Sequence, residues 1–309
     1  MNITSAISKC IADLSLAKNT ARTYQNGLNR FVEFLGEHNL PPTQEAGKLE
    51  ISHFIEFMPW LDHQFTKSTA NIYNSAAKAL LNYLLIQNVI QINYTDSVRY
   101  QQAVKRSHSK HESKLPRWPK KSDVPKMLQA VHHYHDETPR RERNIALLEM
   151  LASTGCRINE VVMLDIKDVD LVKRTTVVMG KGSKERRVFF SRAAAKAIET
   201  YWTARKSRKA NDPAFARHDR GAGHKQTKRM TTATGRNIVK AIAIVAGIDP
   251  TKFTPHYFRH AFAIRVLSET GNLALTQDLL GHADPKATRN YAKIEAEDLQ
   301  KAHQAIFDK

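Results

Sequence analysis

The side chains best suited to chemistry lie near the C-terminus. His256 and Arg259 are three residues apart, so on a helix they share one face. His282 and Tyr291 are nine residues apart, which on one unbroken helix is about 900° and would point them in opposite directions. The pair Asp284-Pro285 between them is typical of a helix start. We therefore expect two short helices that turn His282 and Tyr291 into one pocket.

A phenol, two imidazoles and a guanidinium in one pocket would suit phosphoryl transfer without a metal. Tyr291 is the expected nucleophile, because tyrosine can form covalent intermediates. The arginine would bind two non-bridging phosphate oxygens, and the histidines would donate to the phosphate or exchange protons with it. In-line displacement needs mainly positioning and neutralisation of charge. A second arginine and an acid for the leaving oxygen must come from elsewhere in the chain.

Both groups occur upstream. Arg157 lies in the segment TGCRINE, and two β-like runs, Arg174–Met179 and Arg187–Phe190, flank a turn with a glycine on each side of Lys181. Glycines let the tip of a hairpin approach another backbone closely. A lysine on such a tip could enter a DNA minor groove and protonate a leaving oxygen.

With these residues in this order and spacing, the chain resembles the tyrosine recombinase (phage integrase) family, including its Xer-like members. The matching segments are TGCRINEVVMLDIKDVD, GKGSKERRV, HYFRHAFA and LLGHADPKATRNYAKI. The resemblance is strong from Pro116 to Ile306 and weak over the first hundred residues. The pair Tyr257-Phe258 is bulkier than that often found inside the HxxR motif, a difference that concerns packing rather than chemistry.

The resemblance implies that a tyrosine attacks a DNA phosphate, forms a 3′-phosphotyrosyl link and frees a 5′-hydroxyl. It implies two arginines that clamp the phosphate, two histidines as acid–base and hydrogen-bonding partners, and a lysine as general acid. The implied catalytic residues are Arg157, Lys181, His256, Arg259, His282 and Tyr291, with Glu160 supporting Arg157 from one helical turn on. No metal, nucleotide or other cofactor is expected, because the phosphotyrosyl bond conserves the energy of the phosphodiester.

The charge of the chain points to a polyanionic partner. The net charge is +18 and the pI is near 9.9, which favours nucleic acid first and an anionic membrane second. No apolar run approaches the ~20 residues that span a bilayer, and the N-terminus lacks the pattern of a signal peptide. Cys10 and Cys156 are too few for a disulfide framework. We expect a soluble, cytoplasmic, nucleoid-associated protein that binds double-stranded DNA and no membrane.

The hydrophobic pattern predicts a mainly α fold with a small antiparallel β-sheet, in two domains. Residues 1–103 contain helical patterns at 20–38, 43–58 and 66–86. The family resemblance would make them a helical, SAM-like core-binding domain, whereas the pattern alone fits any small helical bundle. Residues 104–121 are predicted to be a basic linker, either a solvated tether or a strap along the DNA backbone.

Residues 122–309 would be the α+β catalytic domain. Helices are expected at 123–135, 141–153, 191–208 and 234–247, and strands at 165–171, 174–179 and 187–190. The basic stretch Arg205–Arg229 is either a mobile surface loop or a segment that follows phosphates. The tail helix 295–309 would pack on its own core or, as often in the family, on a neighbouring protomer.

The sequence contains two further sets of polar residues that could bind a ligand. His132, His133 and His135 fit an exposed helix face better than a metal site, because no second ligand cluster completes the set. Polar residues at helix starts and in basic segments are candidate DNA contacts, since helix N-termini favour phosphates. They are Lys18, Arg22, Gln25, Lys67, Ser68, Asn71, Lys184, Arg186, Arg187, Lys225, Lys228 and Arg229.

The sequence therefore predicts a site-specific recombinase. It would act as a homotetramer on two DNA sites with inverted-repeat cores, through a Holliday junction, and would be a monomer or dimer off DNA. It would integrate or excise a mobile element or resolve DNA dimers, with or without accessory proteins. No room is left for a separate arm-type domain, which favours a simple, bidirectional enzyme. The alternatives are a type IB topoisomerase-like DNA relaxing enzyme and a non-catalytic DNA-binding protein.

Overall fold

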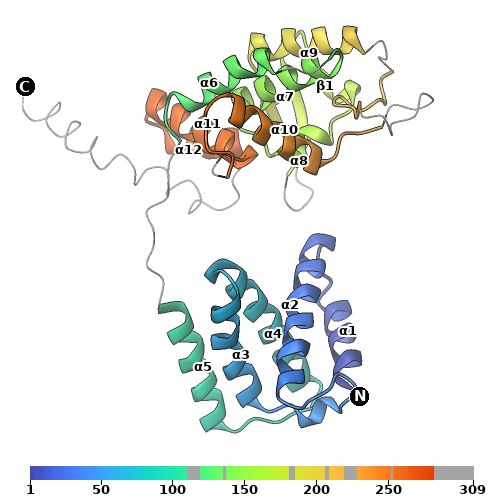
Figure 1. Ribbon diagram of the computed structural model, residues 1–309, viewed down its shortest axis with the longest axis vertical. Helices are drawn as coiled ribbons and strands as arrows, with labels where there is room; N and C mark the ends of the chain where they lie inside the picture. The colour runs from blue at the N-terminus through green and yellow to red at the C-terminus, as the bar shows by residue number, and fades with distance from the viewer. Residues whose placement is uncertain are drawn as a thin grey trace, which may run out of the picture. The chain divides into compact units, whose positions relative to one another are not determined.

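The computed structural model describes residues 1–109, 119–134, 137–180, 185–205, 209–218, 228–251 and 253–281. The chain divides into two units, Met1–Leu115 and Pro116–Lys309 (Figure 1). Each unit has its own hydrophobic core. The described residues form helices and one three-stranded antiparallel sheet, so the predicted fold class is confirmed. Within these ranges no helix is both long and apolar enough to cross a membrane.

The N-terminal unit is a helical bundle around a cluster of aromatic side chains. The ring of Phe31 lies 4.8 Å from that of Phe54 and 5.0 Å from that of Phe57, measured between centroids. Helix α2 packs against α4, and α3 packs against α4 and α5. The helices are α1 (Ile3–Asp13), α2 (Lys18–Glu37), α3 (Ile51–Gln64), α4 (Lys67–Ile86) and α5 (Tyr94–Ser109), with a 3₁₀ turn at Ala46–Lys48.

The second predicted helix, 43–58, was wrong at both ends, because α3 begins and ends later. Pro59 removes one backbone hydrogen bond inside α3. Phe57 and Leu61 around it are fully buried, so tertiary packing carries the helix through the proline. Helices α1 and α5 were not predicted individually. Helix α5 covers residues 104–109 of the predicted linker, whose residues 110–118 lie outside the described ranges.

The C-terminal unit combines helices with the small sheet. The strands follow the order β1-β2-β3, and β2 pairs with β3 so that Val178 lies opposite Arg186 and Val177 opposite Arg187. The helices are α6 (Asp123–Ala130), α7 (Arg140–Thr154), α8 (Ile158–Val162), α9 (Arg192–Ala204), α10 (Thr232–Val245), α11 (Pro255–Thr270) and α12 (Leu273–Leu280). The strands are β1 (Val169–Asp170), β2 (Thr175–Met179) and β3 (Glu185–Phe189), and 3₁₀ turns cover Val131–His133 and Ile166–Asp168.

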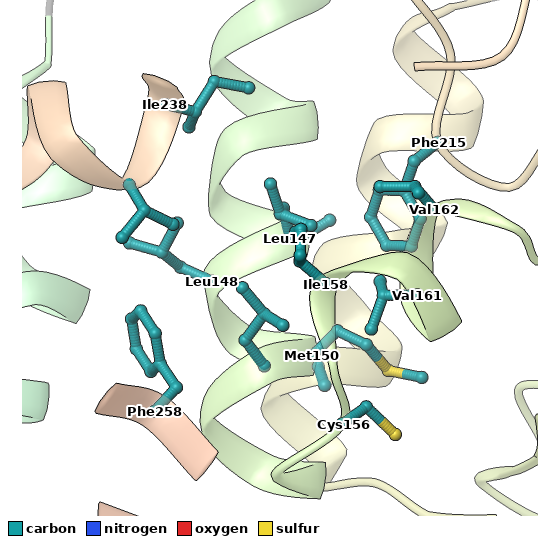
Figure 2. Packing of buried hydrophobic residues seen from close by; sticks show 14 of the residues in the cluster. Leu147, Leu148, Met150, Cys156, Ile158, Val161, Val162, Phe215, Ile238 and Phe258 are labelled. Atoms are coloured by element: carbon teal, nitrogen blue, oxygen red, sulfur yellow. The ribbon is translucent and has the colours of Figure 1, made fainter. Parts of the chain in front are cut away.

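Helix α7 runs through the centre of this unit (Figure 2). Its residues Leu147, Leu148, Met150 and Leu151 are fully buried, and α7 packs against α9 and α11. A helix buried on most of its surface cannot shift without disturbing several neighbours. The C-terminal end of α7 at Thr154 is therefore a fixed point from which the next residues are positioned.

Three predicted elements of this unit differ in length. The helix predicted at 123–135 ends at Ala130 and is followed by a 3₁₀ turn. The strand predicted at 165–171 is reduced to β1, because a 3₁₀ turn precedes it. The helix predicted at 191–208 is α9, which spans Arg192–Ala204. Ser191 caps it by accepting a hydrogen bond from the Ala194 N–H at 3.1 Å. The predicted three-stranded antiparallel sheet is confirmed.

Candidate active site

The segment that carries Arg157 begins where α7 ends. Gly155 terminates α7 with φ +61°, a left-handed conformation that favours glycine. A Cβ on Gly155 would also lie 2.7 Å from the ring of Phe262 on α11, so the glycine allows α11 to approach closely. The backbone then extends through Arg157, which stands at the start of α8. The backbone thus brings Arg157 close to α11.

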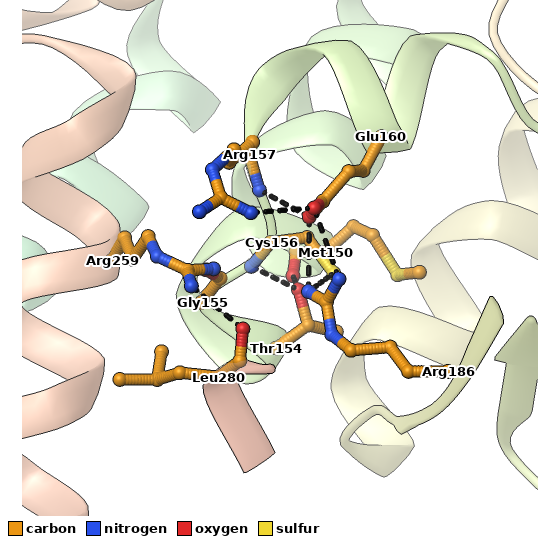
Figure 3. A network of polar contacts seen from close by, with 9 residues as sticks. All are labelled: Met150, Thr154, Gly155, Cys156, Arg157, Glu160, Arg186, Arg259 and Leu280. Atoms are coloured by element: carbon orange, nitrogen blue, oxygen red, sulfur yellow. Dashed lines mark hydrogen bonds and ion pairs between the residues drawn. The ribbon is translucent and has the colours of Figure 1, made fainter. Parts of the chain in front are cut away.

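Glu160 is the anion at the centre of the site (Figure 3). Its Oε2 accepts from the Arg157 N–H at 2.8 Å and from Arg186 Nη2 at 2.9 Å. Its Oε1 accepts from Arg157 Nη1 and from Arg186 Nη1, both at 2.9 Å. Burial acts to raise the pKa of the carboxyl, but the hydrogen bonds from Arg186 and Arg157 outweigh it and hold the pKa below its usual value. The contact expected between Glu160 and Arg157 is therefore present, and Glu160 stays ionised at neutral pH.

Arg259 reaches the same place from α11. Only 4% of the residue is exposed. Its Nη1 donates to the Gly155 carbonyl oxygen at 2.9 Å and its Nη2 to that of Leu280 at 2.6 Å. Burial, together with the nearby charge of Arg157, lowers the pKa of the Arg259 guanidinium to about 10, so it remains charged at pH 7. Arg259 thus connects the end of α7 to the end of α12, two residues before His282 in the sequence.

His256 precedes Arg259 by one helical turn on α11. Burial and the charges of Arg157, Arg259 and Arg236 lower the pKa of His256 below its ordinary value near 6.5. The imidazole is therefore neutral at pH 7. Arg236, on the exposed side of α10, was not singled out from the sequence, although a basic residue early in a helix before the HxxR motif could have drawn attention to it.

The site holds more positive than negative charge. Among the described residues, Arg157, Arg186 and Arg259 stand around Glu160, so the formal charge is 3 − 1 = +2. Cys156 lies beside them as a neutral thiol, because burial raises its pKa to about 11. Grouped like charges are unfavourable without a partner. The arrangement is suited to an anion with several oxygens, such as a phosphate.

Two arginines that were predicted to contact DNA have partners inside the protein. The side chain of Arg186 is 13% exposed and its two terminal nitrogens donate to Glu160. Arg229 donates to the carbonyl oxygens of Val162 and Leu164, both at 2.9 Å, and pairs with Asp165. These contacts give both arginines partners inside the protein. Contact of either arginine with DNA stays a prediction.

The other candidate DNA contacts in the described ranges are more accessible. Lys18, Arg22, Ser68, Arg187 and Lys228 are exposed. Gln25, Lys67 and Asn71 are half-buried. Of these, Gln25 donates to Asn29 at 2.9 Å and Lys67 pairs with Asp62 at 2.7 Å. Their role at DNA stays a prediction.

The described site contains part of the predicted catalytic set. It brings Arg157, His256 and Arg259 together with Glu160. Lys181, Lys184, Lys225, His282, Tyr291 and the tail helix 295–309 lie outside the described residues. Within the part of the chain that is described, no three His, Cys, Asp or Glu side chains are grouped so that they could hold a metal ion. His135, the last member of the histidine group, lies outside that part.

Comparison with known proteins identifies relatives along nearly the whole chain. Residues 117–298 match the phage integrase family, and residues 10–88 match the phage integrase N-terminal SAM-like domain. The chain is 31% identical over 294 residues to tyrosine recombinase XerD of Vibrio cholerae, covering 93% of this chain and 90% of the relative. It is 30% identical over 293 residues to tyrosine recombinase XerC of Herpetosiphon aurantiacus, covering 94% and 89%.

Solved structures share the fold. The XerH site-specific recombinase bound to its difH substrate has a TM-score of 0.72 at 23% identity, covering 97% of this chain and 83% of that one. The integrase of transposon Tn1549, in complex with transposon right end DNA, has a TM-score of 0.70 at 18% identity, covering 97% and 100%. The expected arrangement, a SAM-like domain followed by a catalytic domain, is thereby confirmed.

Proposed function

This chain belongs to the phage integrase family and is a tyrosine recombinase, and from that premise we propose that it cuts and rejoins DNA through a covalent bond to Tyr291. The observation that supports this chemistry is the group of Arg157, Arg186 and Arg259 around the single carboxylate of Glu160. A partly buried site with a formal charge of +2 is stabilised by an anion that accepts several hydrogen bonds, as a phosphodiester does.

The proposed reaction exchanges one phosphoester bond for another. The phenol oxygen of Tyr291 attacks the phosphorus, and the bond from phosphorus to the 5′ oxygen breaks. His282 takes the proton of the phenol, and Lys181 gives a proton to the leaving oxygen. In the rejoining step a 5′-hydroxyl attacks the phosphotyrosine and these transfers run in reverse. Bond energy is conserved, so the cycle consumes no cofactor.

The two catalytic arginines would bind the non-bridging oxygens in different ways. Arg259 is fixed by its bonds to the Gly155 and Leu280 carbonyl oxygens, so its position costs no reorganisation when the phosphate enters. The side chain of Arg157 is 37% exposed, and Glu160 accepts from only one of its guanidinium nitrogens. Its other guanidinium N–H groups make no hydrogen bond to the part of the chain that the structure describes, and they would bind the substrate.

His256 would respond to the phosphate. Its pKa is held low by burial and by nearby arginines, and an entering phosphate opposes those charges. The pKa of His256 should rise on binding, so that the imidazole gains a proton and donates a hydrogen bond to the phosphate. Binding of DNA would then be coupled to uptake of a proton.

The proposed partner is double-stranded DNA with an inverted-repeat core site. The relative XerH was solved on difH DNA and the Tn1549 integrase on transposon end DNA. A net charge of +18 gives this chain strong attraction to DNA phosphates. We assign core binding to residues 1–103, through exposed side chains such as Lys18, Arg22 and Ser68, and catalysis to residues 122–309.

Strand exchange would require four copies. Two protomers would each cleave one strand, the 5′-hydroxyls would attack across to form a Holliday junction, and the other two protomers would complete the exchange. Docking of residues 295–309 on a neighbouring protomer would couple cleavage to assembly. The biological role would be integration and excision of a mobile element or resolution of DNA dimers, with accessory proteins as optional partners, in the cytoplasm at the nucleoid.

A trapping experiment tests this proposal. Wild-type protein is incubated with nicked duplexes from the DNA that flanks its own gene, and adducts that resist SDS are separated on a gel. The proposal predicts an adduct at a discrete inverted repeat, none with Tyr291→Phe, and a loss of roughly 10²–10³-fold in rate with Arg157→Ala or Arg259→Ala. Adducts with little site preference would indicate a topoisomerase, and tight binding without any adduct would indicate a non-catalytic binder.

A further inference from the structure

Arg186 makes several contacts inside the site that a residue acting only at the DNA surface would not need. It lies on β3, the strand that follows Lys181 in the sequence. Both of its terminal nitrogens donate to Glu160 at 2.9 Å, and Nη2 also lies 3.6 Å from the sulfur of Cys156 (Figure 3). These contacts link the hairpin strand to the segment that carries Arg157.

The stem of Arg186 also lies against Gly281, the residue before His282. A Cβ on Gly281 would be 2.4 Å from Cδ and 2.8 Å from Nε of Arg186, so only glycine leaves room for this side chain. Gly281 has φ +63°, which by itself favours glycine. Among the described residues the buried Nε–H of Arg186 has no hydrogen-bond partner, and an unpaired buried donor costs free energy. Arg186 is therefore held in place mainly by its paired nitrogens.

The charge of Arg186 changes what Glu160 does to Arg157. With Arg186 present, one carboxylate is shared by two arginines. Without it, the same carboxylate would neutralise Arg157 alone, and the formal charge of the site would fall from +2 to 2 − 1 = +1. Because the site is partly buried, the loss of one positive charge would weaken its attraction for a phosphate substantially.

We propose that Arg186 is a positioning residue for DNA cleavage: it orients Glu160 and thereby Arg157, supports the backbone before His282, and offsets the charge of Glu160 so that Arg157 stays available to the scissile phosphate. This inference rests on the proposed function. It explains how a site that must attract an anion can contain a buried glutamate. Lysine cannot reproduce both hydrogen bonds, because an ammonium is a point charge without the planar fork.

The test is a cycle of variants in which charge and packing change separately. Arg186→Met removes the charge and leaves +1. The double variant Glu160→Gln with Arg186→Met restores +2, from Arg157 and Arg259, and leaves an amide oxygen that can still accept from Arg157. Arg192→Met, an exposed arginine at the start of α9, is the matched control. Each protein is assayed for the rate of covalent adduct formation on the nicked duplex that wild type cleaves.

The inference predicts a different cleavage rate for each variant. Arg186→Met should cleave roughly 10- to 100-fold more slowly than wild type, Arg186→Lys should recover part of that loss, and Arg192→Met should match wild type. The double variant should cleave about tenfold faster than Arg186→Met, although it has lost more native hydrogen bonds. Melting curves recorded beside the rates show that each protein is folded at the assay temperature.

A second substrate distinguishes an effect of the charge of Arg186 from an effect on the structure of the site. A methylphosphonate at the scissile position removes one negative charge from the phosphate, so the penalty of Arg186→Met should shrink on it. An equal penalty on both substrates, a double variant no faster than Arg186→Met, or wild-type cleavage by Arg186→Met would each overturn the inference. If wild type itself forms no adduct that depends on Tyr291, the proposed function fails, and the inference fails with it.

Discussion

Replacing Glu160 with glutamine should destabilise the C-terminal unit strongly. Each carboxylate oxygen accepts two hydrogen bonds, from Arg157 N and Arg186 Nη2 at Oε2 and from Arg157 Nη1 and Arg186 Nη1 at Oε1. Glutamine turns one of these oxygens into a donor, so two of the four bonds are lost whichever way the amide lies. Bonds to a charged group contribute about 1.5–3 kcal/mol each, and a broken buried ion pair costs about 3–5 kcal/mol. We expect a loss of about 3–5 kcal/mol.

Cys156 offers a local measure of this loss. It is fully buried beside the network, and Cys10 is the only other cysteine. In a Cys10→Ala background, the rate at which Cys156 reacts with a thiol reagent in increasing urea reports opening of this region. A loss of 3–5 kcal/mol should raise the population of the open form by about 10²–10⁴-fold. Glu149→Gln is the matched control, because burial raises the pKa of Glu149 and neutralising it should cost nothing at pH 7.

The effect should depend on pH in a defined direction. The pKa of Glu160 is lowered in the folded protein. Its contribution is therefore complete above its unfolded pKa of about 4.5 and disappears as the pH falls through the lower folded value. The difference between wild type and Glu160→Gln should be full at pH 7 and shrink below about pH 4.5. Equal protection of Cys156 in both proteins at pH 7, within about 0.5 kcal/mol, would refute this account of the network.

Two further predictions concern neighbouring residues. Gly281→Ala should destabilise the protein by about 1–3 kcal/mol more than Gly271→Ala in thermal unfolding, because both glycines have φ near +62° but only Gly281 is crowded, by Arg186. A Tyr291→Phe protein should bind DNA more tightly as the pH falls below about 7, because phosphate raises the lowered pKa of His256. Adding His256→Gln should flatten that dependence in fluorescence anisotropy, and an unchanged slope would exclude His256 as the linked group.

The sequence predicted the elements in which local pattern and tertiary packing agree. Helix α4 was expected at 66–86 and spans Lys67–Ile86, because its apolar spacing is regular and no breaker interrupts it. Helix α3 was misjudged: it was expected at 43–58, but it spans Ile51–Gln64 and continues through Pro59. The helix continues through Pro59 because the residues around it are buried. Burial depends on packing partners that a local sequence pattern does not reveal.

The position of Arg186 shows a second limit of prediction from the sequence. Strand β3 was predicted to begin at Arg187. That boundary placed Arg186 in the turn, where its side chain would contact solvent or DNA. The observed register pairs Arg186 with the buried Val178 and Arg187 with the exposed Val177, so alternation along β3 turns Arg186 inward. An error of two residues in a strand boundary was enough to reverse the predicted environment of a charged side chain.

The most direct test of the central claim is to identify the atoms joined in the covalent adduct. Wild-type protein is trapped on a nicked duplex, digested with trypsin and nuclease, and the DNA-linked peptide is sequenced by mass spectrometry. The account predicts a peptide joined through Tyr291 to a 3′-phosphate, with a free 5′-hydroxyl on the released strand. A link through another residue, or to a 5′-phosphate, would contradict it.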